Sequence, residues 1–231
     1  MVILKFALKR TFRNPVSMLA SFILPVVFML IPDLWDSSIG GMVGGRGLYL
    51  IALVMMFGTF PLTSGMVQER KENTVIRIMS TPTTAFSYLA QNLIASLVPL
   101  MIQIFLVSIL GFALRGWSLE FTFGVFAAFM LFASASTAFC FAWNCLFKKR
   151  ESTMVALSSF LTFATFILIF PLTVFPQVIK NIFMAFPTFW IASAFDNLIA
   201  YGIGGQFLIT LAILALFTIT FLMYGSKRGT Y

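Results

Sequence analysis

The sequence predicts an all-α polytopic membrane protein. Its expected parts are six transmembrane helices, an N-terminal interfacial helix, a cytoplasmic helix after the second span and re-entrant helices on the outer side. Of its 231 residues, 60% are hydrophobic and only 10% are charged, and the mean hydropathy is +1.01. Uncharged apolar runs of ~20 residues recur along the chain, and a helix needs about that length to cross ~30 Å of hydrocarbon. A soluble domain of this size has no room to bury so much apolar surface.

The apolar runs define the spans in order. They are expected at 16–31, 47–67, 84–113, 121–147, 153–175 and 206–224. None of them carries Asp, Glu, Lys or Arg in its interior. We interpret all of residues 1–231 as one transmembrane domain.

A further apolar stretch lies between Lys180 and Asp196 and suggests a seventh span. These two charges are separated by only 15 residues, and Pro187 interrupts the stretch. That length is too short for a crossing, and proline disfavours a continuous helix. We therefore expect residues 176–205 to form a pair of short re-entrant helices on the outer side.

The basic residues predict the orientation. With six spans and a cytoplasmic N-terminus, only Arg46, Arg115 and Lys180 of the 15 Lys and Arg residues fall outside. This positive-inside bias predicts that both termini are cytoplasmic. The net charge of +8 then reflects topology and contact with anionic membrane lipid, and no nucleic-acid partner is expected.

Several kinds of chemistry find no support in the sequence. There is no histidine, and Cys140 and Cys145 do not share a helix face, so no disulfide or metal site is expected. No phosphate-binding loop of the form Gly-x-x-x-x-Gly-Lys-Ser/Thr occurs, so we expect no ATP hydrolysis, no catalytic residue and no cofactor in this chain. The uncharged spans argue against a proton relay, which would need ionisable groups at membrane depth.

Residues 1–14 have the pattern of a surface helix. Lys5, Lys9 and Arg13 recur every four residues, beside the apolar Leu4 and Leu8. A basic amphipathic helix of this kind suits the surface of an anionic inner leaflet. The alternative is a basic flank without regular structure.

The segment 68–82, QERKENTVIRIMSTP, separates two spans and has the pattern of an amphipathic helix. Its apolar positions are Val75, Ile76, Ile78 and Met79, and its charges are Glu69, Arg70, Lys71, Glu72 and Arg77. Pro82 should end this helix, and Thr83 or Thr84 should cap the next one. The alternative is an ordinary interfacial loop.

These segments together resemble ABC-2 type permeases, the membrane subunits of bacterial ATP-binding-cassette exporters with the ABCG-like fold. That family carries E-R-E/K-x-G-T followed, after a hydrophobic stretch, by T-P. Here residues 68–74 and 80–82 match in order, with Asn73 in place of the usual glycine. The family's elbow helix, its first span with an internal proline and its re-entrant segment resemble residues 5–25, with Pro25, and 175–190, with Pro176 and Pro187.

The resemblance implies a transporter subunit in the bacterial cell membrane, working as a homodimer or with a paralogue. ATP and Mg²⁺ would be bound by a separate ABC ATPase partner. Residues 68–82 would be the coupling helix that docks on this partner. The implied coupling residues are Glu69, Arg70, Lys71, Glu72, Asn73, Thr74, Ile76, Arg77 and Met79.

In that family the second and fifth spans line the substrate route. The residues implied here are Met56, Phe57, Phe60 and Thr63 in the second span and Phe163, Phe166 and Phe170 in the fifth. Such aromatic stripes suit an amphipathic substrate, such as a drug, an antimicrobial peptide or a lipid. With 29 phenylalanines in the chain, ordinary packing also produces such stripes. Export of haem or polysaccharide, and a membrane scaffold without transport, remain the alternatives.

Overall fold

The computed structural model describes residues 2–11, 15–35, 46–71, 80, 84–146, 164–165, 167–170 and 175–228. Only the backbone is described for residues 2–4, 10, 11, 15–22, 33, 60–71, 146 and 228. Every regular element in this part of the chain is a helix. The elements are α1 (Val2–Thr11), α2 (Pro15–Leu30), the 3₁₀ turn η1 (Pro32–Leu34), α3 (Gly47–Lys71), α5 (Ala85–Arg115), α6 (Leu119–Leu146), α8 (Gln177–Phe183), α9 (Pro187–Tyr201) and α10 (Gly205–Arg228).

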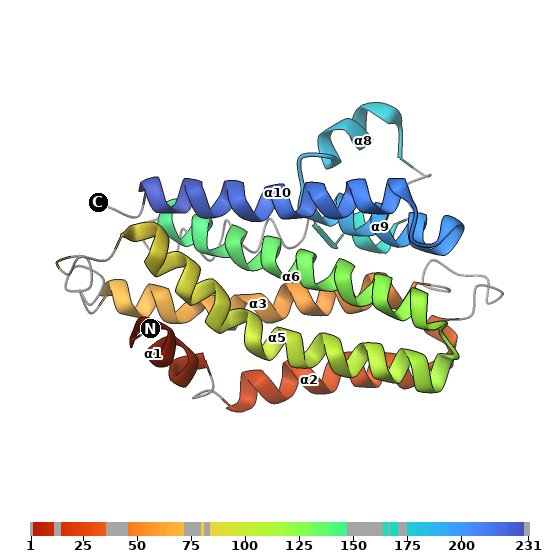
Figure 1. Ribbon diagram of the computed structural model, residues 1–231, viewed down its shortest axis with the longest axis horizontal. Coiled ribbons are helices and arrows are strands. Elements are labelled where there is room, and N and C mark those ends of the chain that lie inside the picture. The colour runs from red at the N-terminus through yellow and green to blue at the C-terminus, as the bar shows by residue number, and fades with distance from the viewer. Residues whose placement is uncertain are drawn as a thin grey trace.

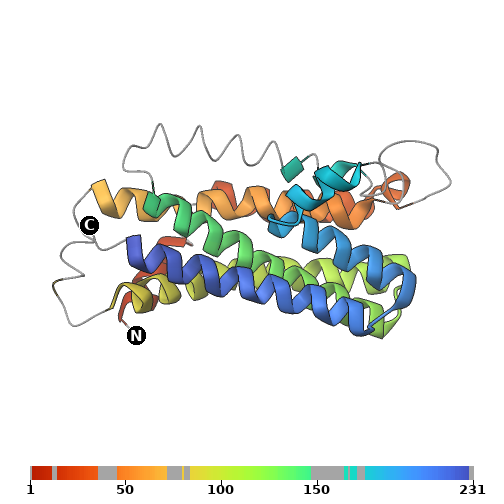
Figure 2. The ribbon, with the colours of Figure 1, turned by 90° about the horizontal axis from the view of Figure 1, so that it is seen from above.

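The long helices lie side by side in one bundle, and the short α1 crosses one end of it (Figure 1). The start of the chain, the last turn of α3, the start of α5 and the end of α10 share that end, which we call the terminal end. The end of α5, the start of α6 and the start of α10 share the opposite, distal end (Figure 2). Both termini therefore lie at the same end of the bundle.

Helix α6 is the centre of the bundle. It packs against α3, α5, α9 and α10. Of its most apolar stretch, 67% is buried inside the protein, whereas the corresponding stretch of α10 is only 22% buried. Hydrogen bonds also join α6 to its neighbours: Ser134 and Thr218 of α10 share one at 3.0 Å. A polar contact at 3.6 Å joins Thr59 of α3 to the sulfur of Cys140.

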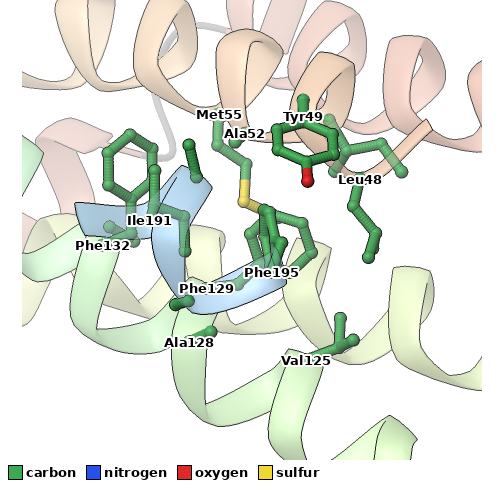
Figure 3. Packing of buried hydrophobic residues seen from close by; sticks show 14 of the residues in the cluster. Leu48, Tyr49, Ala52, Met55, Val125, Ala128, Phe129, Phe132, Ile191 and Phe195 are labelled. Carbon is green, nitrogen blue, oxygen red and sulfur yellow. The ribbon is translucent and has the colours of Figure 1, made fainter. Parts of the chain in front are cut away.

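Aromatic side chains fill the core where three helices meet. The ring of Phe195 in α9 lies 5.6 Å from Tyr49 of α3 and 5.1 Å from Phe129 of α6, in edge-to-face arrangements (Figure 3). Phe129 and Phe195 are fully buried, as is Met55 beside them. Edge-to-face pairs of this kind are worth about 0.5–1.5 kcal/mol beyond the area that they bury.

Local sequence signals explain the ends of α5. Thr84 is its N-cap, and the Thr84 hydroxyl accepts a hydrogen bond from the backbone N–H of Ser87 at 3.2 Å. This confirms the expected cap at Thr83 or Thr84. At the other end Gly116 adopts a positive φ of 64°, the left-handed conformation that ends many helices and that glycine adopts without strain.

The structure confirms a polytopic α-helical membrane protein. Within the described residues α5, α6 and α10 are each long and apolar enough to cross a membrane. Helices α8 and α9 taken together are also long and apolar enough for a crossing, but they are bent by 111° relative to each other. The pair is therefore a broken span or a re-entrant loop. Large apolar side chains remain exposed along α5 and α10, including Phe105, Ile109, Leu216 and Ile219. Such surface suits contact with lipid.

The helices correspond closely to the expected spans, except that α3 and α10 each run four residues past the predicted end, to Lys71 and Arg228. Helices α2, α3, α5, α6 and α10 begin and end within about one helical turn of the predicted bounds. The apolar pattern predicts that the second span stops at residue 67, but α3 continues to Lys71. Residues 66–71 contain no glycine or proline, so nothing in the sequence ends the helix there. In the fifth span only residues 164–165 and 167–169 are described as helical.

Candidate functional site

The predicted coupling residues begin at the terminal end of α3. Glu69, Arg70 and Lys71 form its last turn, so residues 68–71 continue the second helix and do not start a separate one. Residues 72–79, which include Glu72, Asn73, Thr74, Ile76, Arg77 and Met79, lie outside the described residues, as do residues 81–83. Ser80 is exposed in a turn. The structure thus places the first three coupling residues at the same end as both termini (Figure 1).

Helix α1 lies against the terminal end with an apolar and basic outer surface. Ala7 is buried, and the helix packs against α5 and α3. Lys5 and Lys9 are exposed, and Phe6 is 68% exposed. A helix that turns lysines and a phenylalanine outward is suited to the headgroup region of a membrane. This arrangement is compatible with the interfacial helix expected over residues 1–14.

The predicted route residues of α3 do not share one environment. Met56 is buried in the core, whereas Phe57 is 44% exposed. Because neighbouring residues in a helix point in directions about 100° apart, the two side chains face different surroundings. Phe60 and Thr63 lie further along α3, where only the backbone is described. Of the described pair, Phe57 is the side chain available to contact another molecule.

The fifth span contributes one described route residue. Phe163 and Phe166 lie outside the described residues. The ring of the partly exposed Phe170 lies 6.3 Å from Phe175, which in turn packs 4.9 Å from Phe183 of α8. An aromatic row therefore leads from the end of this span to the bent α8–α9 pair. Its use by a substrate remains a prediction.

A polar cluster at the distal end joins three segments that are far apart in sequence. The hydroxyl of Tyr49 in α3 donates a hydrogen bond to the Oδ1 carboxylate oxygen of Asp196 in α9. The guanidinium of Arg46 lies over the Tyr49 ring, 4.9 Å from its centroid. Nη1 of Arg46 also donates to the carbonyl oxygens of Leu168 and Ile169, at 3.4 and 3.0 Å.

The two carbonyl groups are available because the helix of the fifth span ends there. Pro171 follows shortly after and has no backbone N–H, and proline disfavours the helical conformation of the preceding residue, Phe170. The last carbonyls of a helix have no partner within it. Arg46 therefore supplies a charged donor to groups that would otherwise need water.

A second cluster at the distal end holds α2. Nη2 of Arg115 donates to the carbonyl oxygens of Met29 and Ile31, at 2.7 and 3.0 Å. Its guanidinium lies 5.4 Å from the ring of Trp35, whose ring is 5.6 Å from that of Trp117. Nε1 of Trp35 donates to the carbonyl oxygen of Phe28 at 3.0 Å. Arg46 and Arg115 are thus both engaged by backbone carbonyls.

No signal in the sequence points to these two clusters. Arg46 and Tyr49 have the spacing of neighbours on one helix, but their partners are distant in the chain, at positions 168, 169 and 196. From the sequence, Arg46 and Arg115 are recognisable only as markers of orientation. Among the described residues, no group of three or more Cys, Asp and Glu side chains is arranged to hold a metal ion.

Comparison with protein families places the chain among membrane transporter proteins. A model of the ABC-2 family transporter proteins matches residues 36–227. The match covers α3 through nearly all of α10. It includes Arg46, Tyr49, Arg115 and Asp196 of the two distal clusters, and the predicted coupling segment. No curated protein matches the chain.

Proposed function

Because the chain belongs to the ABC-2 family of transporter proteins, we propose that it is the permease subunit of an ATP-driven exporter. As a member of this family it is a membrane component of an ABC transporter, and such components work with an ABC ATPase. We propose export as the direction, a bacterial cell membrane as the location, and two permease copies, identical or paralogous, per complex. The single observation that carries the proposal is the family match over residues 36–227.

We propose six crossings with the terminal end in the cytoplasm. The arrangement of the helices supports this orientation, because both termini share one end with the last turn of α3 (Figure 1). Exposed Lys5, Lys9 and Lys227 lie toward that end. At the distal end Arg46 and Arg115 donate hydrogen bonds to backbone carbonyl groups, which holds both cations against the protein.

In the proposed mechanism the ATPase supplies movement and the permease supplies the route. ATP binding would close the two ATPase subunits and draw together the coupling segments at 69–79. Because α3 is continuous from Gly47 to Lys71, a displacement at its terminal end can be passed along the helix to its distal end. The route would then change from inward-open to outward-open.

We propose an amphipathic substrate, such as a drug, an antimicrobial peptide or a lipid. The described aromatic side chains of the candidate route, Phe57, Phe170 and Phe175, are at least partly exposed and favour an apolar surface on the substrate. A permease for haem or polysaccharide has the same family match, and a scaffold without transport is the alternative from another class. No observation favours either over the first proposal.

Co-expression with the ABC ATPase partner tests the proposal. We expect the two proteins to co-purify, the complex in proteoliposomes to hydrolyse ATP, and an amphipathic substrate to stimulate hydrolysis and to be moved. The permease alone should hydrolyse none. The control is an ATPase whose phosphate-loop lysine is replaced by alanine. A stable complex that moves no substrate and shows no stimulation would favour the scaffold, and no complex at all would refute the proposal.

A further inference from the structure

We propose that Arg46, Tyr49 and Asp196 form a latch that holds the distal end of the bundle closed and opens during each transport cycle. We call these three residues, with the carbonyl groups of Leu168 and Ile169, the distal latch. The proposal rests on the proposed transport function, because only alternating access requires the distal ends of these segments to separate. It assigns a role to side chains that lie outside the predicted coupling and route residues.

Tyr49 is the shared part of the latch. Its hydroxyl donates to Asp196, its ring face receives the guanidinium of Arg46 at 4.9 Å, and it lies edge-to-face with Phe195 at 5.6 Å. Arg46 then reaches the carbonyls of Leu168 and Ile169. Through one tyrosine and one arginine, α3 is bound both to α9 and to the end of the fifth span.

Two of the three latch residues are exposed enough for a contact that opens and closes. Asp196 is exposed and Arg46 is partly exposed, so water can replace the hydrogen bonds that each would lose. Hydrogen bonds exchanged for water contribute modestly, and those to a charged group contribute somewhat more. The rings beneath the latch, Phe129 and Phe195, are fully buried and pack the three helices together. The Tyr49 ring is buried and packs against Phe195, so opening of the latch also separates these two rings and admits water to the core beside them.

The segments joined by the latch are bounded by breaks in the chain. Helix α9 follows a 111° bend after α8 and ends at Tyr201, before Gly202, which has a positive φ of 68°. The helix of the fifth span ends at Ile169, two residues before Pro171. A segment can move as a rigid unit when such a break lies at its end, because the backbone rotation is taken up at the break.

Labelling of a buried cysteine tests the latch. Ala52 lies one turn below Tyr49 on α3 and is fully buried (Figure 3). The experiment uses Ala52→Cys in the full complex in membranes, with Cys140 and Cys145 replaced by alanine, and a membrane-impermeant maleimide added from outside. Tyr49→Phe removes only the hydroxyl, and we expect labelling about two- to tenfold faster. Asp196→Ala should give a similar increase, and Asp196→Asn, which still accepts a hydrogen bond, a smaller one.

Tyr201→Phe is the matched control. Tyr201 is also on α9 at the distal end, but it is 80% exposed and belongs to neither distal cluster. This variant should label at the rate of the parent. Because Asp196 is exposed, Asp196→Ala should fold even if Tyr49→Phe does not, and fluorescence-detected size-exclusion chromatography checks assembly of each variant. Unchanged labelling of the assembled latch variants, or an equal increase in Tyr201→Phe, would overturn the latch.

Trapping the complex with a nucleotide analogue distinguishes a latch that opens during transport from a static clasp, which stays closed throughout. Trapping the parent Ala52→Cys complex with a non-hydrolysable ATP analogue should raise the labelling of the introduced thiol toward the level seen with Tyr49→Phe. If transport occurs and trapping leaves the labelling unchanged, the cluster is a static clasp and the proposal is wrong. If the variants label faster but no substrate is moved by any complex, the cluster does hold the distal end closed and it is the proposed function that fails.

Discussion

Nη2 of Arg115, in the last turn of α5, donates a hydrogen bond of 2.7 Å to the carbonyl oxygen of Met29, near the end of α2. The pair is separated by 86 residues and joins the ends of two neighbouring helices. Helix α2 is only 16 residues long, and its last carbonyls have no partner within the helix. Arg115 therefore fixes the distal end of α2 to the bundle.

Arg115→Ala should lower the free energy of unfolding by about 1.5–3 kcal/mol, because two carbonyl groups lose a charged donor. Arg115→Lys should cost less, since it keeps the charge but not the planar fork. Thermal unfolding in detergent, followed by tryptophan fluorescence, measures both. Lys180→Ala, another cation toward the distal end, is the control. Equal unfolding temperatures for Arg115→Ala and Lys180→Ala would contradict this account of the contact.

Gly47→Ala should destabilise the protein, because a methyl group at this position would overlap the indole of Trp35. That ring is rigid and is held by its hydrogen bond to Phe28, so we expect a cost of roughly 1–3 kcal/mol. At Gly205, the first residue of α10, nothing lies within 4 Å of an added methyl group. Gly205→Ala should therefore be neutral or slightly stabilising. The same unfolding assay decides, and a Gly47→Ala protein as stable as Gly205→Ala would refute the close approach.

Reporter fusions should support the proposed topology. We expect cytoplasmic signals at Lys71, Lys149 and the C-terminus, and external signals near Arg115 and Asp196. The physical reason is the clustering of basic residues at the terminal end, which resists transfer across the membrane. Labelling of a C-terminal tag from outside intact cells would exclude the six-span arrangement.

Phe57→Ala should weaken the response to substrate more than Phe105→Ala. Both phenylalanines are exposed, by 44% and 58%, but Phe57 lies on the candidate route helix α3 and Phe105 on the lipid-facing side of α5. Loss of one aromatic contact of about 1.4 kcal/mol would raise the half-saturating substrate concentration roughly tenfold. Substrate-stimulated ATPase activity measures this value. Similar values for the two variants would mean that Phe57 faces lipid.

Charge reversal should uncouple the ATPase only when several residues of the coupling segment change together. Solvent-accessible ion pairs are worth ~0–1 kcal/mol each, so Glu69→Lys or Glu72→Lys alone should reduce coupling partly. The double reversal, or Ile76→Asp with Met79→Asp, should abolish substrate stimulation while the helices stay folded. Lys227→Gln, at the same end of the bundle, is the control. Normal stimulation in both multiple variants would show that the segment is an ordinary loop.

The helices are well predicted from the sequence because each signal is local. Uncharged runs place α5, α6 and α10, Thr84 caps α5, and the prolines at 176 and 187 mark the α8–α9 pair. The extension of α3 to Lys71 is not predicted, because a change from apolar to charged residues marks the membrane surface and does not end a helix. Contacts such as Tyr49 with Asp196 depend on how helices pack, and one sequence contains no periodicity that pairs position 49 with 196.

The central position of α6 also determines how the chain must be assembled as it is made. Its buried face carries Ser136, Thr137 and Asn144, and Ser134 shares its hydrogen bond with Thr218 of α10. α10 is synthesised last of all these helices, so α6 enters the membrane before its most extensive neighbour exists. The hydroxyls of Ser134 and Thr137 already donate to the carbonyl oxygens of Leu131 and Ala133 within α6, but the contact of Ser134 with Thr218 forms only once α10 has been made. The final helix to be made therefore completes the packing of the one at the centre.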